Sequence, residues 1–271
     1  MNRLAGLVCL VTGSTGIAAA SAELFAAEGA ALFVTSRTEA NCRALADRIA
    51  TRGGRVAYRA ADLTEQDAVE AAVADCVTAY GRIDGLFSVA GGSGRAFGDG
   101  PIDQLDAEAW DATIALNLRS QALVCRSVVR QMRAQEPNDS GTRGSILLMG
   151  SVTATDPVPE LFGTHAYAAA KGAIAALTTA MAATYVGDLI RVNAVAPSLT
   201  RTQMATRAAN DERILAFARR KQPLAGEMLD PVEVANAAVY FLSNESRAVT
   251  GQVLKVDGGW SVVSVGPDAP E

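Results

Sequence analysis

The chain has 271 residues, enough for one large α/β domain or two small ones. Hydrophobic residues make up 49% of it and aromatic residues only 5%, so alanine, valine and leucine must form most of the core, as in proteins that layer helices on a sheet. The net charge of −5 excludes a basic nucleic-acid-binding surface, and no apolar run reaches the roughly 18–20 residues of a membrane span.

The residues that commonly bind metals or form disulfides are sparse and scattered. The four cysteines form no CxxC pair, and His165 is the single histidine. We therefore expect neither a disulfide framework nor a metal site. The N-terminus runs directly into an apolar strand without the apolar stretch of a signal peptide, so the cytoplasm is the expected compartment.

The first predicted element is a wholly apolar strand at 7–11, a pattern typical of strands buried on both faces. A glycine turn follows, and then an alanine-rich helix to about Glu28. Glycines let the backbone approach a ligand, and the free N–H groups of a helix N-terminus bind anions, so the turn indicates a pyrophosphate site. An ordinary tight turn is the alternative. The residues concerned are Gly13, Ser14, Thr15, Gly16 and Ile17.

The second predicted strand, 31–35, ends at Ser36-Arg37. An NAD-preferring dehydrogenase tends to place an acidic residue here for the adenosine ribose. No carboxylate stands at this strand end, and the guanidinium of Arg37 could hold a 2′-phosphate, which favours NADP(H) over NAD(H). A solvated surface arginine is the alternative. A helix over 38–52 follows.

The third and fourth predicted strands, 56–60 and 86–89, each lead into candidate ligand-binding residues. Asp62 and Leu63 follow the third strand, where an adenine edge would lie, although Asp62 could instead cap the helix over 65–81. The fourth strand runs into a loop with five glycines between Gly91 and Gly100. Open α/β sheets bind ligands at this end of a strand. Arg95 in this loop is either solvated or a partner for an acidic substrate group.

A short helix is predicted over 103–113 and a longer one over 115–134, with Asn117 buried for a polar purpose. The fifth strand, 145–149, ends at Ser151, whose hydroxyl could equally bond local backbone. The segment 156–164 contains two prolines and is expected to be a loop that overhangs Ser151.

Tyr167 and Lys171 lie four residues apart, on one face of a helix predicted to extend through about Ala180. A phenol has a pKa of about 10. Lowering it by about 3 units takes roughly 4 kcal/mol, which one nearby ammonium can supply. The pair is therefore a credible acid/base, and a half-buried tyrosine beside a lysine is the alternative. His165 is expected to be structural.

The last predicted elements are a strand at 190–195, a helix that begins at Pro231 with Asp230 as its cap, and a strand at 252–256. The polar segment 200–226 is expected to be a mobile lid, and the tail from Ser261 to be loosely held. Strands alternate with helices throughout, which predicts a single doubly wound α/β Rossmann domain over 1–271. Its sheet would have about seven parallel strands flanked by helices on both faces.

In this order, the motifs resemble those of the short-chain dehydrogenase/reductase family. The glycine turn resembles the family's TGxxxGxG, and Tyr167-xxx-Lys171 resembles its YxxxK. The segments 192–197 and 256–259 are near-literal matches to two further segments of the family. The length fits the branch of the 3-oxoacyl-carrier-protein reductases. The resemblance covers the chain from Leu4 to Gly259 and implies hydride transfer between a nicotinamide cofactor and a carbonyl or alcohol.

The resemblance also implies roles for individual residues. Tyr167 would exchange a proton with the substrate oxygen, Lys171 would lower its pKa and bind the nicotinamide ribose, and Ser151 would hydrogen-bond the carbonyl. Asn117 would hold a water in a proton relay. The implied cofactor contacts are the turn residues, Ser36, Arg37, Asp62, Leu63, Ala90, Gly91, Tyr167, Lys171, Pro197, Thr200 and Thr202. Relatives commonly form tetramers through the helices near 115–134 and 166–186, so a homotetramer or homodimer is expected here.

The chain departs from the family pattern in places. The glycine turn is shorter, with only Ser14 and Thr15 between its first two glycines, and Ala18 replaces the last glycine. A cofactor-binding regulatory protein without turnover is therefore an alternative function. An epimerase or dehydratase of the longer branch is a second alternative, against which the length argues.

Overall fold

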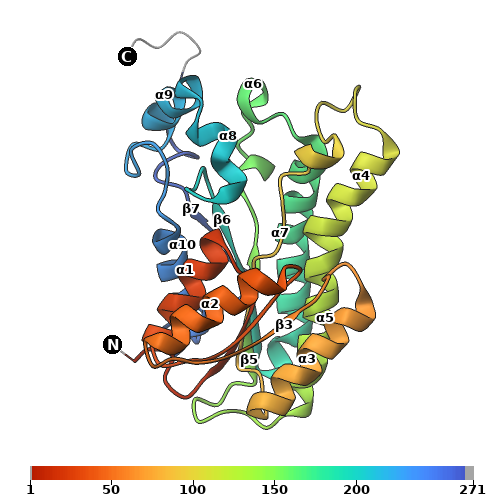
Figure 1. Ribbon diagram of the computed structural model, residues 1–271, viewed down its shortest axis with the longest axis vertical. Helices are drawn as coiled ribbons and strands as arrows, with labels where there is room; N and C mark the ends of the chain where they lie inside the picture. The colour runs from red at the N-terminus through yellow and green to blue at the C-terminus, as the bar shows by residue number, and fades with distance from the viewer. Residues whose placement is uncertain (1, 266–271) are drawn as a thin grey trace.

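The computed structural model describes residues 2–265, whose seven strands form one parallel sheet in the order β3-β2-β1-β4-β5-β6-β7. The order reverses between β1 and β4, which makes this the switch point of a doubly wound fold. The predicted fold class is therefore confirmed (Figure 1). The strands are β1 (Val8–Thr12), β2 (Ala31–Ser36), β3 (Arg55–Ala60), β4 (Gly85–Ser88), β5 (Gly144–Met149), β6 (Ile190–Pro197) and β7 (Val253–Val256).

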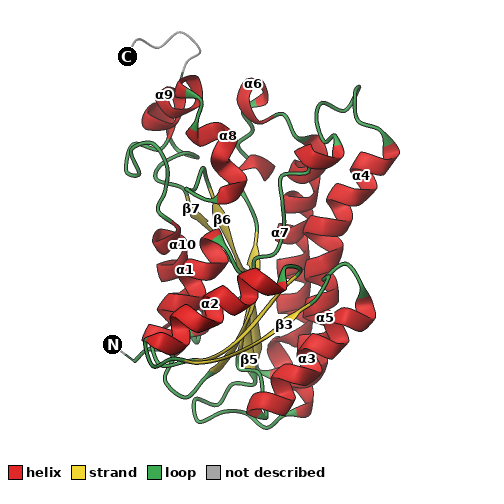
Figure 2. Ribbon diagram, viewed as in Figure 1, coloured by secondary structure: helices red, strands yellow, loops and turns green. Residues whose placement is uncertain are grey.

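Helices cover both faces of this sheet (Figure 2). One face carries α1 (Gly16–Ala27), α2 (Glu39–Thr51) and α10 (Pro231–Leu242). The other carries α3 (Gln66–Tyr80), α5 (Ser120–Ala134) and α7 (His165–Tyr185), with α4 (Ala107–Ile114) packed on α7. Side chains along β1 alternate between the two cores: Val8 and Leu10 face one, and Cys9 and Val11 the other. This alternation explains why the strand is wholly apolar.

The predicted break between two helices near residue 114 is wrong. The chain is helical without interruption from Ala107 to Ala134, through one π-helical turn at Ala115–Arg119. No glycine or proline lies in this stretch to end the helix. The helix begins later than predicted because Asp106 caps it, accepting a hydrogen bond from the Ala109 N–H at 2.7 Å.

Helices lie within the predicted loop and within the predicted lid. The loop over 156–164 contains α6 (Pro159–Phe162), and the lid over 200–226 contains α8 (Thr206–Ala209) and α9 (Glu212–Lys221). The apolar side chains of Ile214 and Ala218 on α9 are buried, which holds it against the body of the protein.

The predictions for the C-terminal part divide in two. Asp230 caps α10 as predicted, accepting from the Val232 N–H at 2.9 Å. The tail is held at its start, where the Ser261 N–H donates to Asp257 at 3.0 Å. The remainder of the predicted loose tail, 266–271, lies outside the described residues. Within the described part of the chain, no helix has the length and apolar character needed to cross a membrane.

Candidate active site

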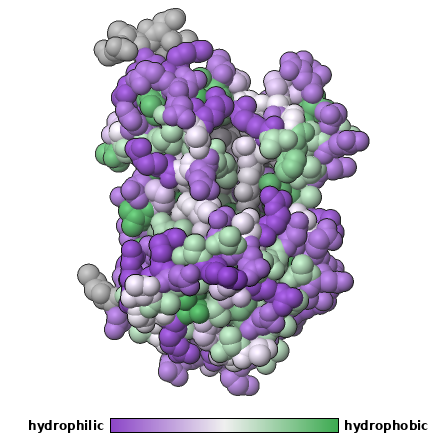
Figure 3. Space-filling view, viewed as in Figure 1, coloured by the Kyte–Doolittle hydropathy of each residue, from purple (hydrophilic) through white to green (hydrophobic). Residues whose placement is uncertain are grey.

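A cleft of about 420 Å³ opens at the carboxyl edge of the sheet, beside the switch point between β1 and β4. The ends of β1, β4, β5 and β6 line it, together with α6, α7 and α8. Figure 3 shows the surface hollowed between the part formed by α8 and α9 and the part formed by α6 and α4. This is the place where open α/β sheets bind ligands.

Tyr167 and Lys171 both line the cleft from α7, as predicted. The Lys171 side chain is buried, its Nζ donates to the Met149 carbonyl at 2.9 Å, and it lies 5.5 Å from the centroid of the Tyr167 ring. Burial lowers the pKa of Lys171 to about 7. The amine therefore keeps only part of its positive charge near neutral pH.

The pKa of Tyr167 differs from the sequence-based prediction. Burial raises this pKa above its ordinary value, and a hydrogen bond with Ser151 acts in the opposite direction. The predicted lowering by Lys171 is therefore wrong for the structure as it stands, because burial disfavours the charged forms of both side chains.

Ser151 lies at the end of β5 and joins a short chain of hydroxyls. The Thr153 hydroxyl donates to Ser151 Oγ at 2.9 Å, and Ser151 is in turn hydrogen-bonded to Tyr167. Thr153 also lines the cleft, and no sequence motif pointed to it. The chain orients the Ser151 hydroxyl toward Tyr167, where a carbonyl oxygen could accept from both.

Asn117 is buried in the π-helical turn, as predicted, but its side chain holds the glycine-rich loop. Its Nδ2 donates to the carbonyls of Gly92 at 2.8 Å and Thr113 at 3.0 Å, and its Oδ1 accepts from the Gly92 N–H at 3.1 Å. Both amide hydrogens thus have protein partners. The water relay implied by the resemblance therefore cannot use this Nδ2 as a donor without breaking one of these bonds.

Gln121 ties the same turn to β5 and was missed by the sequence analysis. Its Nε2 donates to the carbonyls of Asn117 at 3.0 Å and Met149 at 3.2 Å, and its Oε1 accepts from the Met149 N–H at 3.0 Å. The Met149 carbonyl is also the acceptor for Lys171. Gln121 therefore fixes the oxygen that holds the Lys171 amine.

Asp99 positions the N-terminus of α7. Its carboxylate accepts from the N–H groups of Ala166 at 3.0 Å and Tyr167 at 2.9 Å, whereas Thr164 at the N-cap makes no side-chain capping bond. His165 is structural, as predicted, because its Nδ1 accepts from the Ile102 N–H at 3.0 Å. The loop after β4 therefore clamps the first turn of the helix that carries Tyr167.

The glycine turn fits the pyrophosphate of a dinucleotide. Gly13 and Gly16 have φ angles of 99° and 54°, and α1 begins at Gly16 without an acidic residue in its first turn. A Cβ on Gly16 would lie 2.9 Å from Thr202 Cγ2. A Cβ on Gly13 would lie 2.9 Å from the Cβ of Ala18, so Ala18 packs closely against the shortened turn. The free N–H groups of α1 therefore face the cleft with space for an anion.

The cleft brings together most of the residues predicted to bind the cofactor. Five lie outside its lining: one within the glycine turn and four near the ends of β2 and β3. The hydroxyls of Ser14 and Ser36 are 2.7 Å apart, which joins the turn to β2. The residues in the cleft are Gly13, Thr15, Gly16, Ile17, Ala90, Gly91, Tyr167, Lys171, Pro197, Thr200 and Thr202, with Asn117 and Ser151; those outside are Ser14, Ser36, Arg37, Asp62 and Leu63.

Asp62 and Arg37 lie near each other outside the cleft. The pKa of Asp62 is lowered by hydrogen bonds from Thr64 and, to a smaller extent, by the charge of Arg37. Asp62 thus accepts a local hydrogen bond from the Thr64 N–H, just before α3. This resembles the helix-capping role that was the alternative to adenine binding. Arg37 itself is exposed at the end of β2.

The far rim of the cleft contains two arginines and two aromatic rings. Arg95 and Arg207 both donate to the Leu161 carbonyl, at 3.5 and 2.8 Å. Phe162 packs on Trp260 with ring centroids 5.9 Å apart. Arg207 and Trp260 had no local signal in the sequence, because only the fold brings α8 and the segment after β7 close to α6.

The described residues contain no group of three or more histidine, cysteine or acidic side chains that could hold a metal ion. The polar groups that converge on the cleft are instead hydroxyls, amides, backbone N–H groups and cationic side chains. This donor set suits an anionic nucleotide and a carbonyl oxygen.

Comparisons with known proteins agree with this geometry. A family model described as enoyl-(acyl carrier protein) reductase matches residues 11–261. The A-factor type gamma-butyrolactone 1'-reductase (1S-forming) of Streptomyces virginiae is 35% identical over 94% of this chain and 96% of its own. The 3-oxoacyl-(acyl-carrier-protein) reductase of Thermotoga maritima is 35% identical over 95% of this chain and 98% of its own.

Solved structures show the same similarity in three dimensions. A short-chain type dehydrogenase/reductase from Mycobacterium ulcerans has a TM-score of 0.87 at 29% identity and covers 96% of this chain and 92% of its own. A short-chain dehydrogenase/reductase from Burkholderia xenovorans has a TM-score of 0.86 at 31% identity, covering 98% of this chain and all of its own. The similarity therefore extends over the whole sheet and both helical layers.

Proposed function

Because the chain belongs to the short-chain dehydrogenase/reductase family and is thus an NAD(P)-dependent oxidoreductase, we propose that it transfers a hydride between NADP(H) and a carbonyl or secondary alcohol substrate. One observation carries the proposal: the hydrogen-bonded hydroxyls of Ser151 and Tyr167 and the buried amine of Lys171 line the same cleft as the glycine turn. The bound nicotinamide supplies the hydride. The residues of the chain supply binding, orientation and the proton.

Tyr167 is the proton donor for reduction. Its raised pKa keeps the hydroxyl protonated at neutral pH, and Ser151 aligns this hydroxyl with the carbonyl oxygen. The Lys171 amine, fixed by Met149, is positioned to hold the nicotinamide ribose and to stabilise the phenolate left after the proton is donated. Asn117 supports the site by holding the glycine-rich loop.

The preference for NADP(H) over NAD(H) rests on Arg37. This arginine is exposed at the end of β2, next to the strand that carries the glycine turn, where it could meet a 2′-phosphate. Asp62 nearby interacts with the same guanidinium and would compete with a phosphate for it. Arg37→Asp should reverse the ratio of the NADPH and NADH dissociation constants. A preference for NADPH that survives this substitution would exclude the assignment.

The assembly proposed for the chain is a homotetramer or homodimer formed through α5 and α7, as in relatives. Sedimentation velocity of the full-length protein measures this directly. A monomer at micromolar concentration would contradict it.

The test of the main proposal is Tyr167→Phe. Ketones, acyl thioesters and sugars are screened by NADPH consumption, and the best substrate is then used for the variant. We expect kcat to fall roughly 10²–10⁴-fold while the NADPH dissociation constant, from a fluorescence titration, stays nearly unchanged. Tyr185→Phe, the same change at the other end of α7, is the matched control.

Two outcomes would contradict this function. Substantial turnover by Tyr167→Phe would show that Tyr167 is not the proton donor. NADPH binding by the unsubstituted protein without oxidation by any compound of the screen would favour the cofactor-binding regulatory protein instead.

A further inference from the structure

The charges along the cleft are distributed unlike those of the chain as a whole. The chain has 29 acidic and 24 basic residues. Among the described residues, however, the cleft is lined by Arg95, Lys171 and Arg207 and by no aspartate or glutamate. A cleft of one sign in a net acidic protein favours an anionic ligand.

Arg95 and Arg207 reach the cleft from separate segments and meet at one oxygen. Arg95 follows β4 in the glycine-rich loop, and Arg207 lies on α8. Both guanidinium groups donate to the Leu161 carbonyl. Each guanidinium has five N–H donors, so one shared carbonyl leaves most of their donors without a protein acceptor.

The two arginines are not neutralised by carboxylates in the part of the chain that the structure describes. Neither forms an ion pair, in contrast to Arg219, which bridges Glu212 and Glu227. The acidic group whose charge acts on Arg95 is Asp99, whose two oxygens already bind the first turn of α7. Arg95 is exposed at the surface, and its pKa is lowered by partial desolvation and then by the charge of Arg207, as expected for two cations that face the same space.

The arginines contact the segment that connects the two residues proposed to hold the carbonyl. They bind Leu161, which lies in the chain between Ser151 and Tyr167, the two residues proposed to hold the carbonyl. The Arg207 guanidinium also lies 6.0 Å from the centroid of the Phe162 ring, which packs on Trp260. This end of the cleft therefore combines two cations with an aromatic wall.

We propose that the substrate carries an anionic group, such as a carboxylate, sulfonate or phosphate, and that Arg95 and Arg207 bind it while Ser151 and Tyr167 hold the carbonyl. This inference rests on the proposed function. In the structure the Leu161 carbonyl accepts from one nitrogen of each guanidinium. An anion would bind the remaining donors and compete with this carbonyl, because charge-assisted hydrogen bonds are stronger than those to a neutral carbonyl. Phe162 and Trp260 contact the apolar body of the substrate.

The test compares pairs of ketones that differ only in charge: 4-acetylbenzoate and its methyl ester, 3-oxobutanoate and its methyl ester, and 5-oxohexanoate and its methyl ester. For each pair, the ratio of kcat/KM for the acid to that for the ester is measured with NADPH. We expect a ratio above one that falls roughly tenfold or more in Arg95→Gln and Arg207→Gln. Arg213→Gln removes the same charge from the neighbouring α9, outside the cleft, and should leave the ratio unchanged.

Failure of this inference differs from failure of the proposed function. Reduction of esters as well as or better than acids, or a ratio that the two arginine variants leave unchanged, overturns the anionic substrate and leaves the reductase in place. If no member of any pair is reduced, the same acids are tested for binding by thermal shift of the NADP⁺ complex. Stabilisation by acids over esters that is lost in Arg95→Gln/Arg207→Gln supports the site, and its absence overturns it.

Discussion

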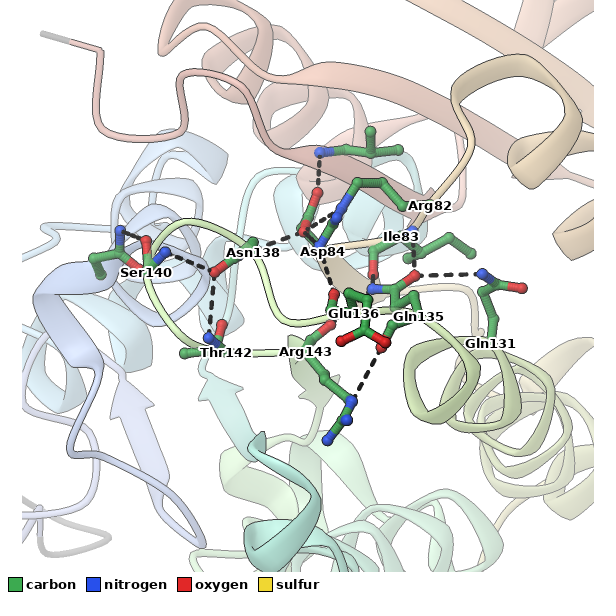
Figure 4. A network of polar contacts seen from close by, with 12 residues as sticks. Arg82, Ile83, Asp84, Gln131, Gln135, Glu136, Asn138, Ser140, Thr142 and Arg143 are labelled. Carbon is green, nitrogen blue, oxygen red and sulfur yellow. Dashed lines mark hydrogen bonds and ion pairs between the residues drawn. The ribbon is translucent and has the colours of Figure 1, made fainter.

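Two charged side chains are buried at opposite edges of the same sheet, and they are paired very differently. Asp84 precedes β4 at the amino edge, where its carboxylate accepts from the Val8 N–H at 3.0 Å and from Arg82 and Asn138 (Figure 4). Lys171 lies near the carboxyl end of β5, and its amine has the Met149 carbonyl as acceptor. Each residue is 3% exposed.

The difference shows what each edge of the sheet does. Hydrogen bonds continue from Asp84 through Asn138 and the neighbouring loop, so its charge is stabilised by a connected network (Figure 4). A buried charge with a complete network holds the fold, and removing one member leaves the others unpaired. A buried amine with one neutral acceptor has a shifted pKa instead, a property that clusters at functional sites.

The largest expected effect comes from removing the incompletely paired charge with Lys171→Met. Activity should fall at least about 100-fold, because the cation that stabilises the phenolate and holds the ribose is lost. The free energy of unfolding should rise at neutral and lower pH, because the variant no longer buries an ammonium group.

The pH dependence of stability makes this test specific. Lys171 has a pKa of about 7 in the folded protein and 10.5 as its ordinary value. Between these pH values the unfolded chain binds more protons, so the stability of the unsubstituted protein rises with pH, by up to about 1.4 kcal/mol per pH unit. Urea unfolding at pH 6–10 should therefore show the advantage of Lys171→Met shrinking as pH rises. Lys221→Met is the control. Parallel curves of stability against pH for the unsubstituted protein and Lys171→Met would contradict a lowered pKa of Lys171.

The second effect should appear at the other edge, in Asp84→Asn. Removing the negative charge weakens the bonds from Val8 and Arg82 and should lower the free energy of unfolding by about 1.5–3 kcal/mol, with kcat of the folded enzyme unchanged. Asp75→Asn removes the carboxylate of an exposed ion pair with Arg59 and should cost below about 1 kcal/mol. Equal losses in the two variants would mean that the network around Asp84 adds nothing.

A smaller effect links both properties in Asp99→Ala. Losing the cap of α7 should cost about 1–2 kcal/mol and should also reduce kcat, because the N–H of Tyr167 itself is released. Asp106→Ala removes a comparable cap from α4 and should lower stability without lowering kcat. Measuring kcat with an uncharged ketone keeps the neighbouring Arg95 out of the comparison. If both variants retain full kcat, Asp99 does not position Tyr167.

Local patterns were sufficient to predict the frame of the site. The seven strands, the glycine turn, Ser151 and the Tyr167–Lys171 pair depend on periodicity and on spacing within a single turn or helix, which the sequence displays directly. Burial of Asn117 followed from its apolar neighbours.

The clamps around this frame could not be predicted, because each joins segments that are distant in the chain. Asp99 meets Tyr167 only after β4 and α7 pack, and Arg207 meets Leu161 only when α8 takes its place along the cleft. The pKa of Tyr167 was predicted in the wrong direction for a related reason. The distance to Lys171 can be estimated from helix geometry, whereas the loss of solvent around both groups depends on the whole fold.

The smallest expected effect is that of Gly172→Ala, which tests whether a residue directly beside Lys171 can be changed without affecting catalysis. Gly172 follows Lys171 directly on α7, yet a Cβ added there would meet nothing within 4 Å. Gly172→Ala should therefore raise the free energy of unfolding by about 0.5–1 kcal/mol, because alanine restricts the unfolded chain and favours helix, and kcat should stay within about twofold of its original value. Urea unfolding and steady-state kinetics measure both quantities. A loss of stability would instead place Gly172 inside the interface proposed for α5 and α7, since the described residues of one chain leave the space open, and sedimentation of the variant would then show a changed assembly.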